Sequence, residues 1–264
     1  MSTTLFARDI EAYLSTFNEN GRLNSEEGFL YGNGDDEVRG ICVTWMATGP
    51  ALAHAANAEC NLIVTHEAVT FWDYPVWAER SPIKEPWDCD RKRLALIEQY
   101  GLTILRAHST VDPTHVGPAL WDALDLPSPV FSGWIYSHHV VETMTVGDLV
   151  ERTKQALGLD GVRVTGDPKR NITHIGTCWG GGGMDRNMHN IVKFLLPRGI
   201  EAVVVGETND FTQRMAMESN ITLIEGGHSP TENDGLQRLA DDLQHQFPRT
   251  KVVFRSQEVP WVTL

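Results

Sequence analysis

The sequence predicts an α/β protein, a layered α/β/α sandwich of two similar lobes with mixed, partly parallel sheets. Short apolar runs typical of buried strands alternate along the chain with stretches of helical periodicity. A strand–helix–strand order occurs in residues 41–67 and again in residues 172–207. Such a unit crosses over in the right-handed sense and pairs its two strands in parallel. We therefore expect a first lobe over residues 1–127 and a second over residues 128–264.

Composition narrows the class of protein. The 264 residues are enough for a sizeable core, and 41% hydrophobic with 22% charged residues is ordinary for a globular chain. A net charge of −13 disfavours binding to a nucleic-acid backbone, and we find no basic patch to offset it. The sequence has no apolar span of about 18 residues, and MSTTLFARDIEAYL at its start has no basic segment followed by an apolar one, so we expect a cytoplasmic protein without membrane contact.

The first lobe is expected to open with a helix over residues 5–17, capped by Thr3 or Thr4. The helix expected over residues 91–100 ends at Gly101, a residue suited to the left-handed cap position. The remaining elements follow from periodicity and turn residues: a short strand and turn at 29–40, strands at 41–47, 61–67 and 102–108, a helix at 51–58, and a helix with Pro118 in its first turn.

The second lobe contains a helix that Thr145 caps, and adjacent His138 and His139 on the strand before it. Strand geometry sends neighbouring side chains to opposite faces, and we expect this pair to be half-exposed. The other elements are strand residues 130–144, 162–167, 172–179, 201–207 and 221–227, helices 145–159, 187–196, 211–218 and 231–246, and an edge strand at 251–256.

Residues 68–90 form a long irregular stretch that holds Phe71, Trp72, Tyr74, Trp77 and Trp87. Its aromatic content argues against disorder. The more common arrangement is a local hydrophobic cluster that anchors the loop. The alternative is a segment that closes over a site at Glu67 and stacks on a planar substrate.

Two further features have mainly structural interpretations. The four cysteines, Cys42, Cys60, Cys89 and Cys178, lack CxxC spacing, so we expect structural, reduced thiols. Four glycines at residues 180–183 follow a strand, but neither a P-loop lysine nor a GxGxxG pattern accompanies them. Close backbone approach to a neighbouring strand end or subunit is at least as good an explanation as an anion site.

Polar groups gather where three apolar runs end. These positions are His66 with Glu67, His108 with Asp112, and His228 with Glu232, while Glu207 ends a fourth run. One such histidine is usually a satisfied loop or core residue, but three similar occurrences favour a shared cation as the partner. Imidazole and carboxylate without thiolate suit Zn, Fe, Mn, Ni or Co, and carboxylates can bridge two such ions.

The same residues carry a resemblance to the NGG-interacting-factor-three-like family, whose bacterial members include GTP cyclohydrolase type 2 homologues and dinuclear metal centre hexameric proteins. It rests on THE at residues 65–67, AHSTVD-PTHVG at 107–117, GGGG at 180–183, VGE at 205–207 and EGGHSPTEN-GLQRLA at 225–240. The last stretch is the most specific, because the family also has GH-x-x-x-E entering a helix there.

The resemblance implies two divalent metal ions in a site over which the two lobes close. The implied ligands are His66, Glu67, Asp112, His228 and Glu232. It places His108 and Glu207 beside the site as acid–base residues, and implies a toroidal homohexamer with two similar α/β lobes and no inserted domain. The chain departs from the family where Glu67 replaces a second histidine, and residues 26–30, EEGFL, match an Asp-Asn-x-Gly stretch only loosely.

Two functions follow as hypotheses. The first is a metal-dependent hydrolase that acts on a small substrate, with ring opening of GTP as one candidate reaction. The alternative is a non-catalytic protein that handles metal or serves as a scaffold. A ring that encircles DNA is opposed by the net charge of −13.

Overall fold

A computed structural model describes residues 4–70 and 86–262 of the chain. It divides into two compact units: unit 1 contains residues 1–111 and 236–257, and unit 2 contains residues 112–235 and 258–264. The sequence predicted a single boundary after residue 127. The chain returns to the first sheet because β11 (Lys251–Arg255) pairs in parallel with β2 (Gly40–Thr44). No helix among the described residues has the length and apolar character needed to cross a membrane.

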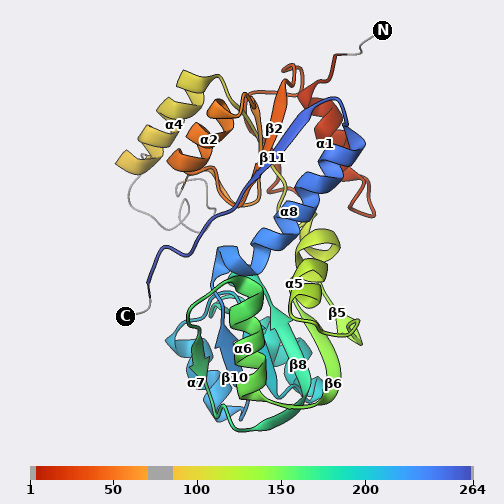
Figure 1. Ribbon diagram of the computed structural model, residues 1–264, viewed down its shortest axis with the longest axis vertical. Coiled ribbons are helices and arrows are strands. Elements are labelled where there is room, and N and C mark those ends of the chain that lie inside the picture. Colours follow the sequence, from red (N-terminus) through yellow and green to blue (C-terminus); the bar gives the residue numbers. More distant parts are fainter. Residues whose placement is uncertain (1–3, 71–85, 263–264) are drawn as a thin grey trace. The chain divides into compact units, whose positions relative to one another are not determined.

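Unit 1 is a three-layer α/β/α arrangement (Figure 1). Its sheet has the order β1-β4-β3-β2-β11, in which only the β1–β4 pair is antiparallel. Besides β2 and β11, its elements are α1 (Ala7–Ser15), β1 (Gly28–Tyr31), α2 (Gly49–Asn57), β3 (Leu62–Thr65), α4 (Asp88–Tyr100), β4 (Thr103–Arg106) and the later part of α8 (His228–Gln246).

Alternation along the strands builds two separate cores in unit 1. Leu62 and Val64 of β3 face a core shared with α1 and α8, whereas Ile63 between them faces a core shared with α2 and α4. Strand side chains point to opposite faces in turn, so helices must cover both faces of this apolar sheet.

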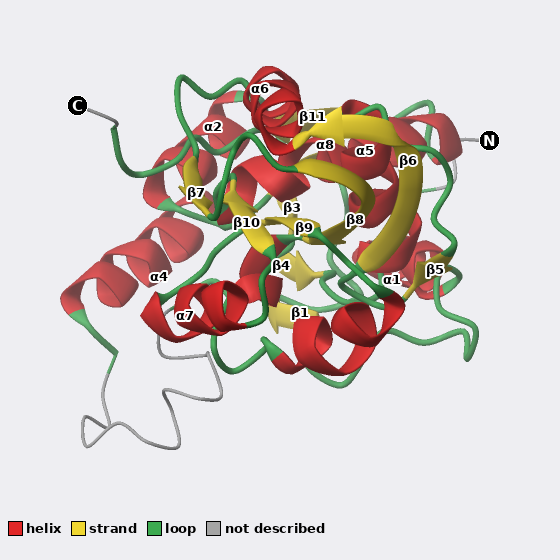
Figure 2. Ribbon diagram, turned by 90° about the horizontal axis from the view of Figure 1, so that it is seen from below, coloured by secondary structure: helices red, strands yellow, loops and turns green. Residues whose placement is uncertain are grey.

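Unit 2 also places helices on both sides of a mixed sheet. Figure 2 shows α6 (Val146–Leu157) and α7 (Asp210–Glu218) on opposite sides of it. The strand order is β5-β6-β8-β9-β10-β7, with parallel pairs β8–β9 and β9–β10. The other elements are the turn η1 (Asp112–Val116), α5 (Gly117–Ala123), β5 (Phe131–Ser132), β6 (Ser137–Thr145), β7 (Arg163–Thr165), β8 (Asn171–Cys178), the turns η2 (Gly180–Gly183), η3 (Asn190–Leu195) and η4 (Leu196–Arg198), β9 (Ala202–Val205) and β10 (Thr222–Glu225).

The predicted fold class is confirmed, and most elements lie where the sequence placed them. Gly101 caps α4 in the left-handed region, and the Thr145 side chain caps α6. The first helix was predicted with a threonine at its N-cap, but Phe6 occupies the N-cap position. The Phe6 N–H donates a hydrogen bond to the Asp9 carboxylate. The helix expected over residues 187–196 is instead a π-helical turn at Asn190–Leu195 that continues into a 3-10 turn.

His138 and His139 were predicted to be half-exposed, but both are buried. Their imidazoles bond to different residues. His139 donates from Nδ1 to the Pro127 carbonyl and accepts at Nε2 from the Ser137 hydroxyl, at 2.7 and 2.6 Å. His138 Nε2 lies 2.9 Å from Nδ1 of His174. Because hydrogen-bond partners are available to each imidazole, the sheet can bury both rings.

Burial favours the neutral form of both imidazoles. Burial is the main cause that lowers the pKa of each; electrostatic interactions with His174 and Arg198 lower that of His138 further, and an interaction with His138 lowers that of His139. The Pro127 carbonyl opposes the shift at His139. A pKa below the unfolded value of 6.5 means that the unfolded chain takes up a proton first as the pH falls.

We therefore predict that the stability contributed by this pair is complete above about pH 6.5 and is lost as the pH falls below that value. Thermal unfolding at pH 7.5 and pH 5.5 measures the loss. His139→Gln should be less stable at pH 7.5 and should show a smaller drop between the two pH values than the wild type. An equal drop in both proteins would contradict the assignment.

Candidate metal centre

The described residues include two buried groups of His, Asp and Glu side chains that could hold metal ions. Their members are His66, Glu67, His108, Asp112, His228 and Glu232. Five of these were predicted as ligands and His108 as a proton carrier. His66, Glu67 and His108 belong to unit 1, and the other three belong to unit 2.

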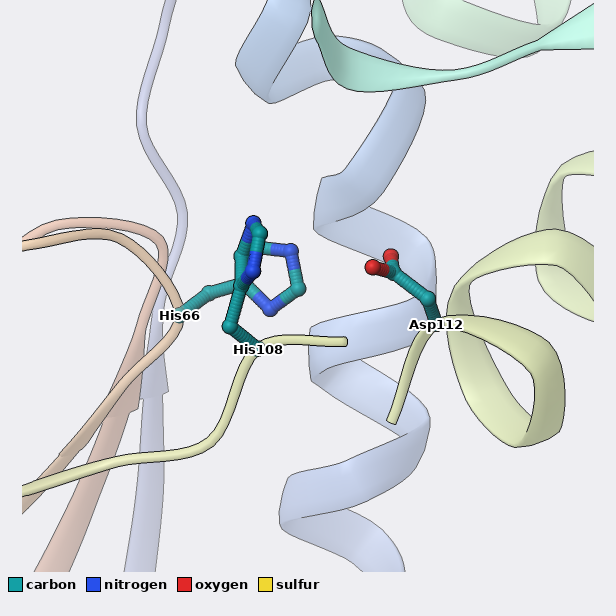
Figure 3. A group of neighbouring side chains, drawn as sticks. All are labelled: His66, His108 and Asp112. Atoms are coloured by element: carbon teal, nitrogen blue, oxygen red, sulfur yellow. The ribbon is translucent and has the colours of Figure 1, made fainter. Parts of the chain in front are cut away.

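His66 follows β3 directly, and its ring has a defined tautomer. Nδ1 lies 3.1 Å from the carbonyl oxygen of Ala107, which follows the neighbouring parallel strand β4. A carbonyl only accepts, so Nδ1 carries the proton and Nε2 keeps its lone pair. This is the usual arrangement of a metal-binding histidine. The ring lies beside that of His108, with 4.6 Å between the centroids (Figure 3).

Arg106, the last residue of β4, is a buried cation that the sequence prediction did not select. Its Nε donates to the His66 carbonyl and its Nη1 to the Glu26 carbonyl, each at 3.1 Å. Its Nη2 lies 3.8 Å from the Glu67 carboxylate, whose side chain is 4% exposed. A charged residue inside the apolar run LTILRA was the available signal, because arginine is rarely buried without an anionic partner.

His108 lies between two carboxylates. Its Nε2 is 3.7 Å from Glu67 and its Nδ1 is 3.9 Å from Glu26. The interaction with His108 is the main cause that lowers the pKa of Glu26 to about 2; burial opposes it, and a hydrogen bond from Ser109 supports it. Glu26 therefore stays ionised beside the imidazole.

Glu27 fixes the loop that carries His108. Its carboxylate accepts hydrogen bonds from the His108 N–H at 2.7 Å and from the Thr110 N–H at 2.8 Å, and it also accepts from the Thr110 hydroxyl. The stretch EEGFL, which matched the family pattern only loosely, thus provides carboxylates for a backbone 81 residues away. Because the two residues are so far apart along the chain, local sequence patterns do not indicate the contact between Glu27 and the His108 loop.

In unit 2, His228 begins α8 and Glu232 lies one turn later on the same face. Nδ1 of His228 is 3.0 Å from the Glu207 carboxylate, and Nε2 is 3.5 Å from Glu232. A proton on Nδ1 satisfies Glu207 and leaves the Nε2 lone pair on the side of Glu232. Glu207 was predicted as a proton carrier, and its carboxylate is placed to orient the His228 ring.

Asp112 begins unit 2 four residues after His108, and both are drawn in Figure 3. Its Oδ1 accepts a hydrogen bond of 2.9 Å from the indole of Trp179, and both side chains are buried. Trp179 was not among the predicted site residues.

The four-glycine turn allows backbone to approach the His228–Glu232 pair. Gly180 has φ +53°, and a Cβ there would overlap the Glu232 carboxylate and lie 2.9 Å from Nε2 of His228. A Cβ on Gly206 would overlap the backbone of Gly180. The structure therefore favours close backbone approach, one of the two explanations that the sequence left open.

The donors are nitrogen and oxygen. Burial raises the pKa of Cys42, to about 12, and also that of Cys60 and Cys178, so these thiols remain protonated. All four cysteines are free, as predicted, although Cys89 is exposed. Of the aromatic stretch, Phe71, Trp72, Tyr74 and Trp77 lie outside the described residues, and Trp87 is the N-cap of α4.

Comparison with known proteins gives consistent matches. The model of the family described as Duf34/NIF3 (NGG1p interacting factor 3) matches residues 12–260. A Pseudomonas aeruginosa protein named GTP cyclohydrolase 1 type 2 homolog is 23% identical over 81% of this chain and 82% of its own length. An Allochromatium vinosum protein of the same name is 24% identical over 78% of both chains.

Solved structures share the fold. A Bacillus cereus protein related to NIF3 superposes with a TM-score of 0.79 over the whole of both chains at 14% identity. A protein from Thermus thermophilus gives 0.69 at 21% identity over 97% of this chain and 98% of its own.

Arg106→Gln should lower the free energy of unfolding by about 3–5 kcal/mol, because it removes the cation beside the buried Glu67 carboxylate. Arg8→Gln is the matched control, since the Arg8–Asp35 pair is solvent-exposed and should be worth about 1 kcal/mol or less. Urea unfolding measures both, and equal losses would show that Arg106 does not compensate buried charge.

Gly180→Ala should cost about 1–3 kcal/mol, because the new Cβ enters the space of Glu232 at a positive φ. Gly181→Ala is the control, because its nearest neighbour would lie at an ordinary 3.6 Å. Denaturant unfolding measures the free energy of unfolding of both variants. A larger loss in Gly180→Ala is expected for crowding at this one position, whereas similar losses would show that the added Cβ does not crowd Glu232.

Proposed function

Because this chain belongs to the Duf34/NIF3 family, we propose that it binds two divalent metal ions and is a metal-dependent hydrolase. The observation that carries the proposal is the buried donor set. In this proposal His66, His108 and Asp112 serve one ion, and Glu67, His228 and Glu232 serve the other. Grouped carboxylates and imidazoles without a cation would be costly to bury.

The tautomers of both ligand histidines support the proposal. His66 is oriented by the Ala107 carbonyl and His228 by the Glu207 carboxylate, so each keeps Nε2 for a metal. Nitrogen and oxygen donors suit Zn, Fe, Mn, Ni or Co. Glu67, an oxygen donor where the family usually has a second histidine, shifts the preference toward the harder ions Mn, Fe or Mg.

Two such ions, when bound, supply Lewis-acid catalysis and a hydroxide nucleophile near neutral pH. His108, with Glu26 and Glu67 on its two sides, can also hold a proton, which gives it a second candidate role besides that of ligand. His108→Ala separates the two roles. A variant that still binds two ions but loses turnover identifies a proton carrier, and a variant that binds one ion identifies a ligand.

The curated relatives bear the name GTP cyclohydrolase 1 type 2 homolog, so a purine nucleotide, GTP, is the first substrate to test. The alternative is a metal-binding protein without catalysis. One observation favours it: His66, Glu67, Asp112 and Glu232 are each at most 3% exposed, as in closed coordination sites. The homohexamer implied by the resemblance stays a prediction, which light scattering after size exclusion would test.

We predict two ions per chain for the wild type and fewer for His66→Ala and His228→Ala. His54→Ala, on helix α2, is the control and should bind two. Metal analysis after dialysis and calorimetric titration measure the number bound. The ligand assignment is wrong if the double variant of His66 and His228 binds as much metal as the wild type.

Turnover of nucleotides, phosphoesters and amides by each metal-loaded form then tests the hydrolase. GTP consumption that disappears in His66→Ala is the expected result. The non-catalytic alternative gains if the wild type binds two ions and turns over none of these compounds.

A further inference from the structure

Trp179 follows β8 directly and precedes the four-glycine turn, and its side chain is fully buried. Its indole Nε1 donates a hydrogen bond of 2.9 Å to Oδ1 of Asp112, which is itself 1% exposed. An indole N–H is a donor only, so the carboxylate oxygen is the acceptor. We propose that Trp179 is a positioning residue that fixes Asp112 as a metal ligand; this rests on the proposed function.

The indole has little freedom to move. A Cβ on Gly117 would lie 2.7 Å from its ring, so the glycine at the start of α5 leaves room for the indole and nothing larger. The Trp121 ring meets it edge-on with 6.4 Å between centroids, and Trp121 is tied by its own Nε1 to Thr177 at 3.3 Å. Packing therefore holds the donor in place before any ion arrives.

The Trp179 indole that bonds to Asp112 is uncharged, whereas the partner of Glu67 is the cation Arg106. Arg106 places a full positive charge 3.8 Å from Glu67, so part of that carboxylate's negative charge is already balanced. Trp179 satisfies one oxygen of Asp112 without adding charge, so the full negative charge stays available to a cation. We therefore expect two unequal binding steps, with Trp179 supporting the step that uses Asp112.

The test compares Trp179→Phe with Trp121→Phe. Both variants remove an indole that packs in the same core of unit 2, but the Trp121 indole bonds to the Thr177 hydroxyl and not to a carboxylate. A phenyl ring at position 121 keeps an aromatic edge against Trp179, so this control removes the indole N–H without releasing the Trp179 ring. Mn²⁺ is titrated into the full chain, and the electron paramagnetic resonance signal of free Mn²⁺ reports what is bound. Thermal unfolding of the metal-free proteins measures the packing cost of each change.

We expect both variants to lose thermal stability, and only Trp179→Phe to weaken one of the two steps, by about 10- to 100-fold, leaving the other unchanged. If both variants bind like the wild type, Trp179 is core packing alone and the inference is overturned. If the wild type binds no Mn²⁺ and no other divalent ion, the proposed function fails instead, so the two failures are distinguishable.

A second measurement applies if Trp179→Phe does not fold. In wild-type protein labelled with ¹⁵N-tryptophan, the Trp179 indole resonance is identified as the one that persists when each of the other seven tryptophans is replaced by phenylalanine in turn. Addition of Zn²⁺ should shift this resonance more than that of Trp121, because the charge on its acceptor changes. An unchanged Trp179 resonance in protein that has bound Zn²⁺ would overturn the inference.

Discussion

Compensation of buried negative charge is the constraint on which the site depends. Glu67, Asp112 and Glu232 are each at most 3% exposed, and an ionised carboxylate removed from water is costly without a partner. Each has a different polar partner, of which only the first is a cation. Arg106 lies beside Glu67, the Trp179 indole bonds to Asp112, and His228 lies one helical turn before Glu232. These partners also limit how far each side chain can turn.

The fold supplies these partners because parallel strands end at one edge. In unit 1, β3 and β4 deliver His66 and His108 to adjacent positions, and in unit 2, β9 and β10 precede Glu207 and His228. Charged groups placed beyond the apolar strands leave the cores intact while they lie at the rim of the sheet. Gly180 then brings backbone against this rim where a side chain would block it.

Much of this follows from local sequence. Apolar runs that end in His66, His108 and His228 were sufficient to predict the strands and to select the imidazoles. The compensating residues were not predictable in this way, because Trp179 meets Asp112 across 67 residues and Glu27 meets His108 across 81. His138 and His139 were placed too near the surface for the same reason, since the partners that permit their burial are separate strands and loops. The domain division differs because β11 returns to the first sheet.

Two bound ions are tested most directly by an anomalous difference map from crystals grown with Mn²⁺, recorded on both sides of the manganese edge. We expect two peaks in every chain, one against Nε2 of His66 and one against Nε2 of His228. A map without peaks at these histidines, from crystals whose mother liquor holds saturating Mn²⁺, would contradict their assignment as metal ligands.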